Sequence, residues 1–402
     1  MKNYLSVVVT GDVDSGKSTL IGRFLYEMGS LSKGVIEEIR DVCQKLEGNF
    51  EFAYLLDSLE EERRNQLTID TTQVFCKTKI GKEFVFIDVP GHKELLKNML
   101  CGSSYADIAI LVVDVRKSIE QQTRRHAFIL KFLGIDQIIV VLNKMDLVGF
   151  DEIIFNKVKN EIVDFSKKTG LPPKYIIPTS ANRGENLIKM SKKMSWYKRL
   201  SLLEALNTCF KKHNNGPFRF PIQDIYNLGK EKIAVGRIIS GEIKKGQNVW
   251  VLPLNKELKL NTIIVFKKNK FKARAPQSIG LRLNRMDNIS RGDVICKLGL
   301  PSVSTRFLIK VFCVRNLDIK KKFTLHCATQ ETFAWISQIN NVWDTASFAL
   351  KPKKMILEES ELTEATIVTE NPLVIESFQG RNSLGRFVLQ DDNEICAIGI
   401  IP

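Results

Sequence analysis

The sequence lacks any apolar run of the length that spans a membrane. It also lacks a Cys-x-x-Cys pair, and its eight cysteines are scattered along the chain. We therefore expect free, mostly buried thiols in a reducing compartment and no metal centre built from cysteine. The first residues lead directly into an apolar segment, without the basic stretch, apolar core and cleavage site of an export signal, so we expect a cytoplasmic location and no membrane partner.

Acidic residues are in the minority, with 45 Asp and Glu against 60 Lys and Arg and a formal net charge of +15. This balance favours an anionic partner without identifying one. Part of the positive charge is concentrated at residues 192–199 and 244–274. Three alternatives remain open for the partner of these clusters: nucleic acid, an acidic protein surface, or no partner. The length of 402 residues, with 44% hydrophobic and 26% charged residues, indicates a globular chain of two or three domains.

A complete phosphate-binding loop follows an apolar run at 4–9 that predicts a strand, and precedes a segment at 19–28 that predicts a helix. Glycine allows the backbone to turn its N–H groups toward phosphate oxygens, and the helix N-terminus adds partial positive charge. Lys17 can reach the β- and γ-phosphates, and the Ser18 hydroxyl can bind Mg²⁺. The residues assigned to this nucleotide-binding loop are Gly11, Asp12, Val13, Asp14, Ser15, Gly16, Lys17, Ser18 and Thr19.

A second phosphate-side segment follows the apolar run at 84–87. Asp88, at the end of the predicted strand, can hold Mg²⁺ through water. The backbone N–H of Gly91 can meet the γ-phosphate. The predicted metal ligands in this part of the chain are therefore Ser18 and Asp88.

Two segments farther along predict recognition of a guanine base. Asp146 can accept two hydrogen bonds from the guanine N1–H and 2-amino group, which adenine does not offer. Asn143 and Lys144 are expected to brace the base and the phosphate loop. Ser180 and Ala181 are expected to supply a backbone N–H to the guanine O6. Any one of these segments could be an ordinary turn or strand end, but all of them in this order favour GTP and Mg²⁺ as the ligands.

The pattern of apolar runs changes along the chain. Up to residue 190, strand-like runs alternate with helical patterns, among them helices predicted at 35–46, 93–101 and 151–169. This alternation predicts a doubly wound α/β domain with a mostly parallel sheet and with ligand loops at the strand C-terminal ends. After residue 212, short β-branched runs alternate with turn residues, which predicts two antiparallel β-barrels. We expect a GTP-binding domain at 1–212 and barrel domains at 213–300 and 301–402.

This arrangement resembles the translation-factor class of GTPases. By that resemblance, Thr68 is the Mg²⁺-binding threonine of the first switch, and His92 orients the water that attacks the γ-phosphate while Lys17 stabilises the developing charge. The residues with implied catalytic roles are thus His92, Lys17 and Thr68. Two positions depart from the class: Gln66 and Ser118 each stand where the family has glycine, and the first departure bears on how the switch closes over Mg²⁺.

Within the class, the stretches at 55–57, 122–126 and 289–293 resemble the large GTPase subunit of sulfate adenylyltransferase, and Arg125 stands where elongation factors usually carry an acidic residue. This resemblance implies that GTP hydrolysis drives formation of adenylylsulfate from ATP and sulfate on a separate small catalytic subunit of the ATP-pyrophosphatase type. No second phosphate loop is present for adenylylsulfate kinase activity. The alternatives are an elongation-factor-like GTPase that binds RNA or the ribosome, and a GTPase that serves another nucleotidyl transfer.

Overall fold

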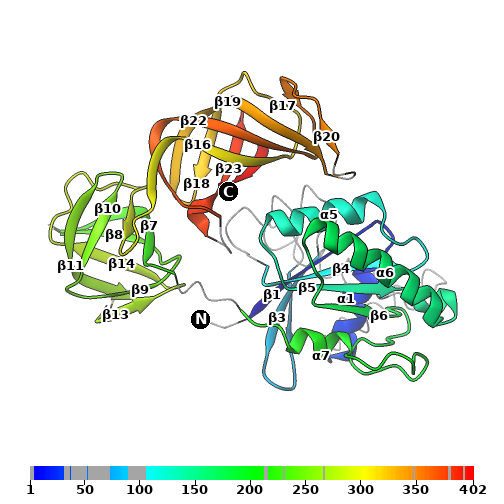
Figure 1. Cartoon of the computed structure of the whole chain (residues 1–402). Helices are drawn as coiled ribbons and strands as arrows, with labels where there is room; N and C mark the ends of the chain where they lie inside the picture. Colours follow the sequence, from blue (N-terminus) through cyan, green and yellow to red (C-terminus); the bar gives the residue numbers. More distant parts are fainter. Residues whose placement is uncertain are drawn as a thin grey trace. The chain divides into compact units, whose positions relative to one another are not determined.

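The computed structural model describes residues 4–30, 37, 52, 73–88, 106–211, 216–229, 231–265, 268–345, 347, 349–378, 382–392 and 394–402. The chain divides into two compact units, Met1–Lys211 and Lys212–Pro402 (Figure 1). The first unit combines helices with a sheet, and the second consists almost entirely of strands. The predicted division of the second part at residue 300 stays a prediction.

A six-stranded sheet in the order β2-β3-β1-β4-β5-β6 forms the centre of the first unit. Five strands run parallel, and β2 pairs antiparallel with β3 at one edge. Every residue of β1, β4 and β5 is buried, as expected for a parallel sheet covered on both faces. The strands are β1 (Leu5–Gly11), β2 (Gln73–Lys77), β3 (Glu83–Asp88), β4 (Ile108–Asp114), β5 (Ile138–Asn143) and β6 (Tyr175–Pro178). The predicted α/β fold class is confirmed.

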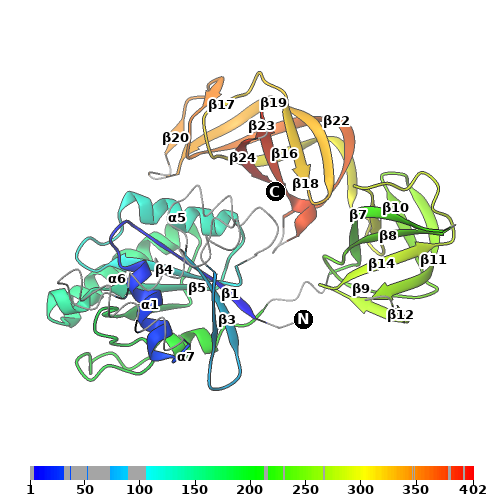
Figure 2. The same cartoon turned by 180° about the vertical axis from the view of Figure 1, so that it is seen from behind.

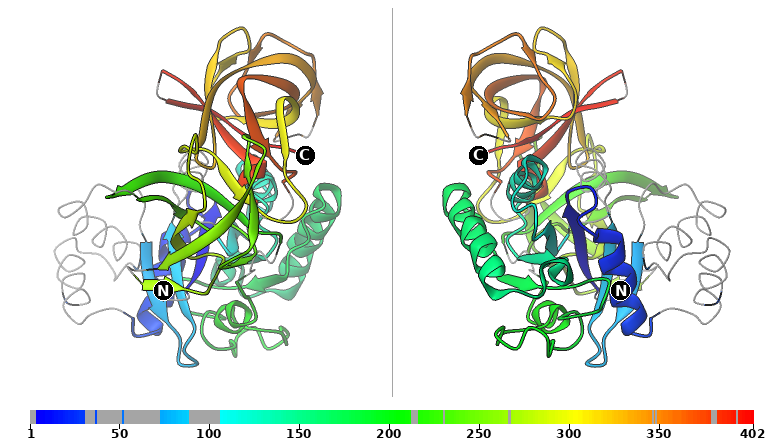
Figure 3. Two further views of the ribbon diagram at one scale, coloured as in Figure 1. Left: turned by 90° about the vertical axis from the view of Figure 1, so that its left-hand side faces the viewer. Right: turned by 90° about the vertical axis from the view of Figure 1, so that its right-hand side faces the viewer.

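Helices lie on both faces of this sheet: α5 (Gln121–Phe132) and α6 (Glu152–Thr169) on one face and α1 (Lys17–Glu27) on the other (Figure 3). Residues at the two ends of α6 determine its length: the Asp151 carboxylate caps the first turn, and Gly170 ends the helix in a left-handed conformation. A short 3-10 helix, η1 (Met145–Val148), follows β5, and α7 (Leu202–Asn207) begins with a capping box formed by Ser201 and Glu204. The helices predicted at 35–46 and 93–101 lie outside the described residues. None of the helices in the described ranges is both long and apolar enough to cross a membrane.

The first barrel of the second unit is a seven-stranded sheet, β10-β15-β7-β8-β14-β11-β12, that closes through an additional pairing of β10 with β11 (Figure 2). Its interior is an apolar core, and a two-stranded sheet of β9 and β13 lies beside it. Its strands are β7 (Arg219–Leu228), β8 (Glu231–Arg237), β9 (Glu242–Lys244), β10 (Asn248–Leu252), β11 (Lys256–Val265), β12 (Lys268–Lys270), β13 (Lys272–Arg274), β14 (Ser278–Leu283) and β15 (Val294–Cys296).

The second barrel has the order β18-β23-β24-β16-β22-β19-β20 and closes through β18 and β19. Two long strands, β19 and β22, bend around it with register shifts. Its elements are β16 (Ser302–Cys313), β17 (Leu317–Asp318), β18 (Phe323–Cys327), β19 (Gln330–Asp344), β20 (Leu350–Lys351), β21 (Ile356–Leu357), β22 (Glu361–Ile375), η2 (Ser383–Gly385), β23 (Arg386–Asp391) and β24 (Glu394–Ile400). The predicted pair of antiparallel barrels is confirmed.

Candidate nucleotide-binding site

The predicted phosphate loop connects the carboxyl end of β1 to α1, at the point where the sheet order reverses and α/β proteins bind ligands. Gly11 and Gly16 have φ angles of 155° and 89°, and a Cβ on Gly11 would overlap the carbonyl oxygen of Val112. A Cβ on Gly16 would lie 2.5 Å from Nδ2 of Asn143. Glycine is therefore required at both bends of the loop. Three more residues were predicted to belong to this site. Val13 and Asp14 in the loop are exposed, and Thr19 in the first turn of α1 is half-buried.

The side chain of Lys17 lies along this loop. Its Nζ donates hydrogen bonds to the carbonyl oxygens of Gly11 (3.0 Å) and Asp12 (2.8 Å). Burial lowers the pKa of Lys17, against the opposing effect of nearby carboxylates. The Ser15 hydroxyl is 1% exposed and has no hydrogen-bond partner among the described residues. A cation and an unpartnered hydroxyl inside a glycine-bounded loop fit the phosphates of a nucleotide.

The two predicted metal ligands in the described ranges lie next to each other. Ser18 Oγ, in the first turn of α1, donates to Asp88 Oδ2 at the end of β3 over 3.2 Å. Hard oxygen donors beside a phosphate site suit Mg²⁺, which usually takes one or two protein oxygens and completes its shell with phosphate and water. These residues therefore fit the ion, and its binding here stays a prediction.

A contact that sequence reasoning did not find joins the phosphate loop to α5. The Thr123 hydroxyl donates to Asp12 Oδ2, and both side chains are buried, at 1% and 8% exposure. Burial raises the pKa of Asp12, and the hydrogen bond from Thr123 acts in the opposite direction. The phosphate loop is thus stabilised by a side chain of α5 as well as by its own backbone conformation.

Asn143 and Lys144 connect the predicted base-binding segments to the phosphate loop. Nδ2 of Asn143 donates to the carbonyl oxygen of Ser15 (2.9 Å), while its Oδ1 accepts from the backbone N–H of Ala181 (2.9 Å). Nζ of Lys144 donates to the carbonyl oxygen of Asp14. The structure therefore brings together three loops that lie far apart in the sequence.

Asp114, at the end of β4, is a second residue that sequence reasoning missed. Its Oδ2 lies 3.1 Å from Nζ of Lys144 and 2.7 Å from Nη2 of Arg116. Burial raises the pKa of this carboxyl, but the hydrogen bonds from Arg116 and Lys144 outweigh burial and lower the pKa to about 2. A sequence signal existed, because Asp114 ends an apolar run in the same way as Asp88 does.

At the predicted guanine position, the Ser180 hydroxyl donates to Oδ1 of Asp146 over 2.6 Å and so orients this carboxylate. The expected N–H donors to O6 already have partners in this structure: Ala181 N–H donates to Asn143, and Ser180 N–H donates to the carbonyl oxygen of Glu185. A contact with O6 would require one of these N–H groups to be shared or exchanged. The base-reading roles of Asp146, Ser180 and Ala181 stay predictions.

The predicted Gly91, Thr68 and His92, and the unusual Gln66, lie outside the described residues. Ser118 is described, and its φ of 59° lies in the left-handed region that favours glycine, the residue that the resemblance implies at this position. Its hydroxyl donates to Glu161 in α6.

Taken together, the fold and the site define a GTPase-type nucleotide-binding domain followed by two β-barrels. Comparison with family models matches residues 2–212 to the elongation factor Tu GTP binding domain, residues 231–296 to elongation factor Tu domain 2, and residues 306–402 to the GTP-eEF1A C-terminal domain-like family. The chain belongs to the elongation factor Tu and elongation factor 1-alpha family of GTPases.

Among its relatives, elongation factor 1-alpha of Methanoculleus marisnigri is 34% identical over 412 residues, covering 99% of this chain and 97% of the relative. Elongation factor 1-alpha of Thermoplasma volcanium is 34% identical over 414 residues, with coverage of 99% and 97%. A solved structure of Sup35 in complex with GDP is 25% identical, covers 100% of this chain and 94% of that chain, and has a TM-score of 0.44.

These relatives bear on the two functional readings of the sequence. Similarity to elongation factors extends over 99% of the chain, whereas the resemblance to a sulfate adenylyltransferase subunit depends on three short stretches. The comparisons therefore do not support the sulfate adenylyltransferase reading and favour the alternative, an elongation-factor-like GTPase.

Proposed function

We propose that this chain is a translation factor that binds RNA, such as aminoacyl-tRNA, in its GTP-bound state and releases it after hydrolysing GTP. The observation that carries the proposal is the continuous similarity to elongation factor 1-alpha over 99% of the chain. Hydrolysis removes the γ-phosphate, and segments that contact this group then rearrange, which is the usual way in which such GTPases change partner affinity.

Different residues of the site would bind the phosphates, the metal ion and the base. Lys17 and the loop N–H groups would hold the phosphates, Ser18 and Asp88 would hold Mg²⁺, and Asp146 would select guanine. When bound, the ion supplies positive charge that offsets the charge developing on the phosphates. Asp146→Asn should shift the nucleotide preference from GTP toward xanthosine triphosphate, because the amide reverses the hydrogen-bonding pattern at the base.

Surface charge on the first barrel supports an anionic partner such as RNA. Strand β12 is exposed throughout, and the outward residues of the neighbouring strands β9 and β13 are mostly cationic. The exposed cations here are Lys244, Lys268, Lys270, Lys272 and Arg274. RNA binding by such a surface would weaken steeply with salt.

The test is binding of aminoacyl-tRNA by the chain loaded with a non-hydrolysable GTP analogue or with GDP. We expect binding at least about tenfold tighter with the analogue, a difference of about 1.4 kcal/mol. Lys17→Ala should remove the dependence on nucleotide. Equal affinity in the two states, or no binding of tRNA in either, would contradict the proposal.

The second candidate is the GTPase subunit of sulfate adenylyltransferase, which Arg125 in the stretch at 122–126 favours. Its test is pyrophosphate release from ATP and sulfate by this chain mixed with an ATP-pyrophosphatase-type small subunit, with and without GTP. Strong stimulation by GTP would support this second candidate, and its absence alongside tRNA binding would leave the translation factor.

A further inference from the structure

Arg23 connects α1 to the loop that carries the predicted base-contacting residues. Its Nη1 donates to the carbonyl oxygen of Asn182 (3.0 Å), and its Nη2 donates to that of Arg183 (3.4 Å). These partners are 159 and 160 residues away along the chain. Arg23 lies six residues beyond Lys17 on the same helix, so one rigid element contacts both ends of the nucleotide site.

The guanidinium is itself fixed in place. Its Nε lies 2.7 Å from Oε1 of Glu27, one turn farther along α1, and the group stacks 4.8 Å from the centre of the Phe52 ring. Gly184 lies against this pair with a φ of 75°, and a Cβ there would overlap Oε1 of Glu27 and come within 2.7 Å of Nη2 of Arg23. The close approach of the loop to α1 therefore depends on glycine at 184.

On its other side, the same loop is held by the base-reading segment. The Ser180 hydroxyl donates to Asp146 and accepts from the backbone N–H of Arg183 (3.3 Å), while Ala181 N–H donates to Asn143. Arg23 is thus the contact that ties the far side of the loop to the phosphate-binding helix. The position of Ser180 relative to the phosphates depends on both attachments.

We propose that Arg23 is a positioning residue for base selectivity: it holds the 180–185 loop at the correct distance from the phosphate loop so that a guanine nucleotide is bound at its base and its phosphates together. This inference rests on the proposed nucleotide site and not on the RNA partner. Arg23 acts through the loop and does not touch the nucleotide. Its loss should therefore weaken recognition of the base and leave recognition of the phosphates intact.

The experiment measures the affinities of GTP, ATP and inorganic tripolyphosphate for the full chain and its Arg23→Ala variant. We expect GTP affinity to fall about tenfold, consistent with the loss of hydrogen bonds from a charged donor, while tripolyphosphate affinity changes less than about twofold. In steady-state hydrolysis, KM for GTP should rise with little change in kcat.

Two further variants make the test specific. Arg23→Lys keeps the charge but cannot span two carbonyl oxygens as the planar guanidinium does, so it should not restore GTP affinity. Arg199→Ala removes an exposed arginine elsewhere in the same unit and should bind GTP as the wild type does. Full rescue by Arg23→Lys would contradict the bidentate role.

The outcomes separate this inference from the proposed function. Equal losses of GTP and tripolyphosphate affinity, or an unchanged preference for GTP over ATP in Arg23→Ala, would overturn the role of Arg23 alone. A wild-type chain with no preference for GTP over ATP would overturn the proposed guanine site and this inference with it. A preference for GTP that depends on Arg23, in a chain that does not bind tRNA, would support the inference and contradict the translation-factor proposal.

Discussion

The guanidinium of Arg219 and the carboxylate of Glu376 form an ion pair, with Nη2 and Oε1 2.6 Å apart, between strand β7 of one barrel and the segment that follows β22 of the other. The Arg219 side chain is almost completely buried and also donates to the carbonyl oxygens of Phe218, Lys297 and Leu298. A small apolar cluster, which includes Leu252 and Val374, lies between residues of the same two barrels. The two barrels thus share a buried interface within the second unit.

Replacing Glu376 with alanine should destabilise the second unit by about 3 kcal/mol, because it leaves a buried guanidinium without its counter-charge. Urea denaturation followed by circular dichroism would measure the change. Glu231→Ala, which breaks an exposed pair with Arg282, is the matched control and should cost less than about 1 kcal/mol. Similar effects in the two variants would show that the buried pair contributes no more than a surface pair.

Gly16→Ala should weaken nucleotide binding by at least about a hundredfold, because the added Cβ would lie 2.5 Å from Asn143 Nδ2 in a left-handed backbone. Gly81→Ala is a close control, since Gly81 has a similar φ of 83° but no atom within 4 Å of the Cβ position. Its cost should be limited to backbone strain of about 1 kcal/mol in stability, with nucleotide affinity unchanged. Titration with a fluorescent GTP analogue would compare them. Retained binding in Gly16→Ala would exclude the proposed loop geometry.

The buried Asp12 carboxyl should make stability depend on pH. Burial raises its pKa above 3.8, so the folded state favours the protonated form, and the stabilisation present below the unfolded pKa is lost as pH rises through the folded pKa. Thr123→Val removes the hydrogen bond that opposes this shift, so the pKa of Asp12 should rise further. Thr123→Ser should behave as the wild type does. NMR titration of the Asp12 carboxyl would measure the pKa, and an unchanged value in Thr123→Val would count against the hydrogen bond.

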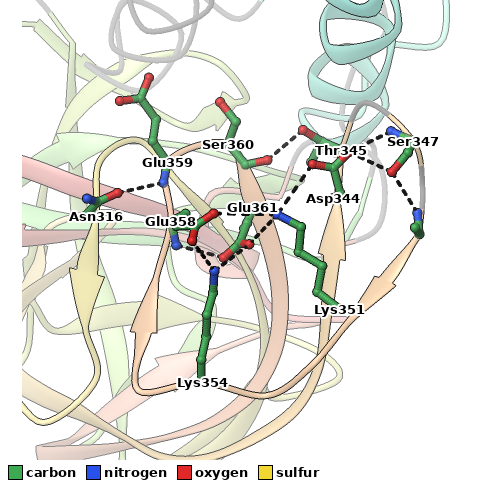
Figure 4. Close-up of polar contacts among 11 residues, drawn as sticks. Asn316, Asp344, Thr345, Ser347, Lys351, Lys354, Glu358, Glu359, Ser360 and Glu361 are labelled. Carbon is green, nitrogen blue, oxygen red and sulfur yellow. Dashed lines mark hydrogen bonds and ion pairs between the residues drawn. The ribbon is translucent and has the colours of Figure 1, made fainter.

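A network on the second barrel should respond to pH in the opposite direction (Figure 4). Glu361 is 1% exposed, and its Oε1 lies 2.8 Å from Nζ of Lys351 and 3.0 Å from Nζ of Lys354. Burial raises the pKa of Glu361, but the hydrogen bonds from Lys351, the Glu358 backbone N–H and Lys354 together lower it below 4.5. The resulting stabilisation is present above pH 4.5 and is lost as pH falls through the folded pKa.

Glu361→Gln should therefore destabilise the barrel at pH 7 by about 1.5 kcal/mol, through weaker hydrogen bonds to the two lysines, and reduce the loss of stability on acidification. Glu358→Gln, at a carboxylate whose side chain is 60% exposed, provides the control and should change little. Thermal unfolding at pH 7 and pH 4 would measure both variants. Equal sensitivity to acid in Glu361→Gln and wild type would exclude Glu361 as the titrating group.

Local patterns predicted much of the first unit. The phosphate loop, its flanking strand and α1 lie within one continuous segment, where glycine, apolar periodicity and helix signals act over a few residues. The helix predicted at 151–169 matches α6 closely because Asp151 and Gly170 are local start and stop signals. The segment at Asn143, predicted to contact the base, is also marked in the sequence by the apolar run that precedes it.

Contacts across the fold could not be predicted in this way. Asp114 pairs with Lys144, and Thr123 donates a hydrogen bond to Asp12. No local sequence pattern around Asp114 or Thr123 identifies these partners. The partner of the Ala181 N–H likewise depends on how β6 and β5 lie side by side, because its acceptor is the Asn143 side chain at the end of β5. The resemblance to a sulfate adenylyltransferase subunit likewise depends on short local stretches such as 122–126, whereas similarity to elongation factor 1-alpha extends over 99% of the chain.

The sequence by itself determined the phosphate-loop motif, the carboxylates predicted for a metal and a base, and the order of an α/β domain and two barrels, because these depend on residue type and short-range periodicity. The tertiary structure alone decided which residues hold these features in place. Arg23 meets the loop 159 residues away, and Arg219 meets Glu376 157 residues away, because strand pairing and core burial bring together segments that no local signal connects.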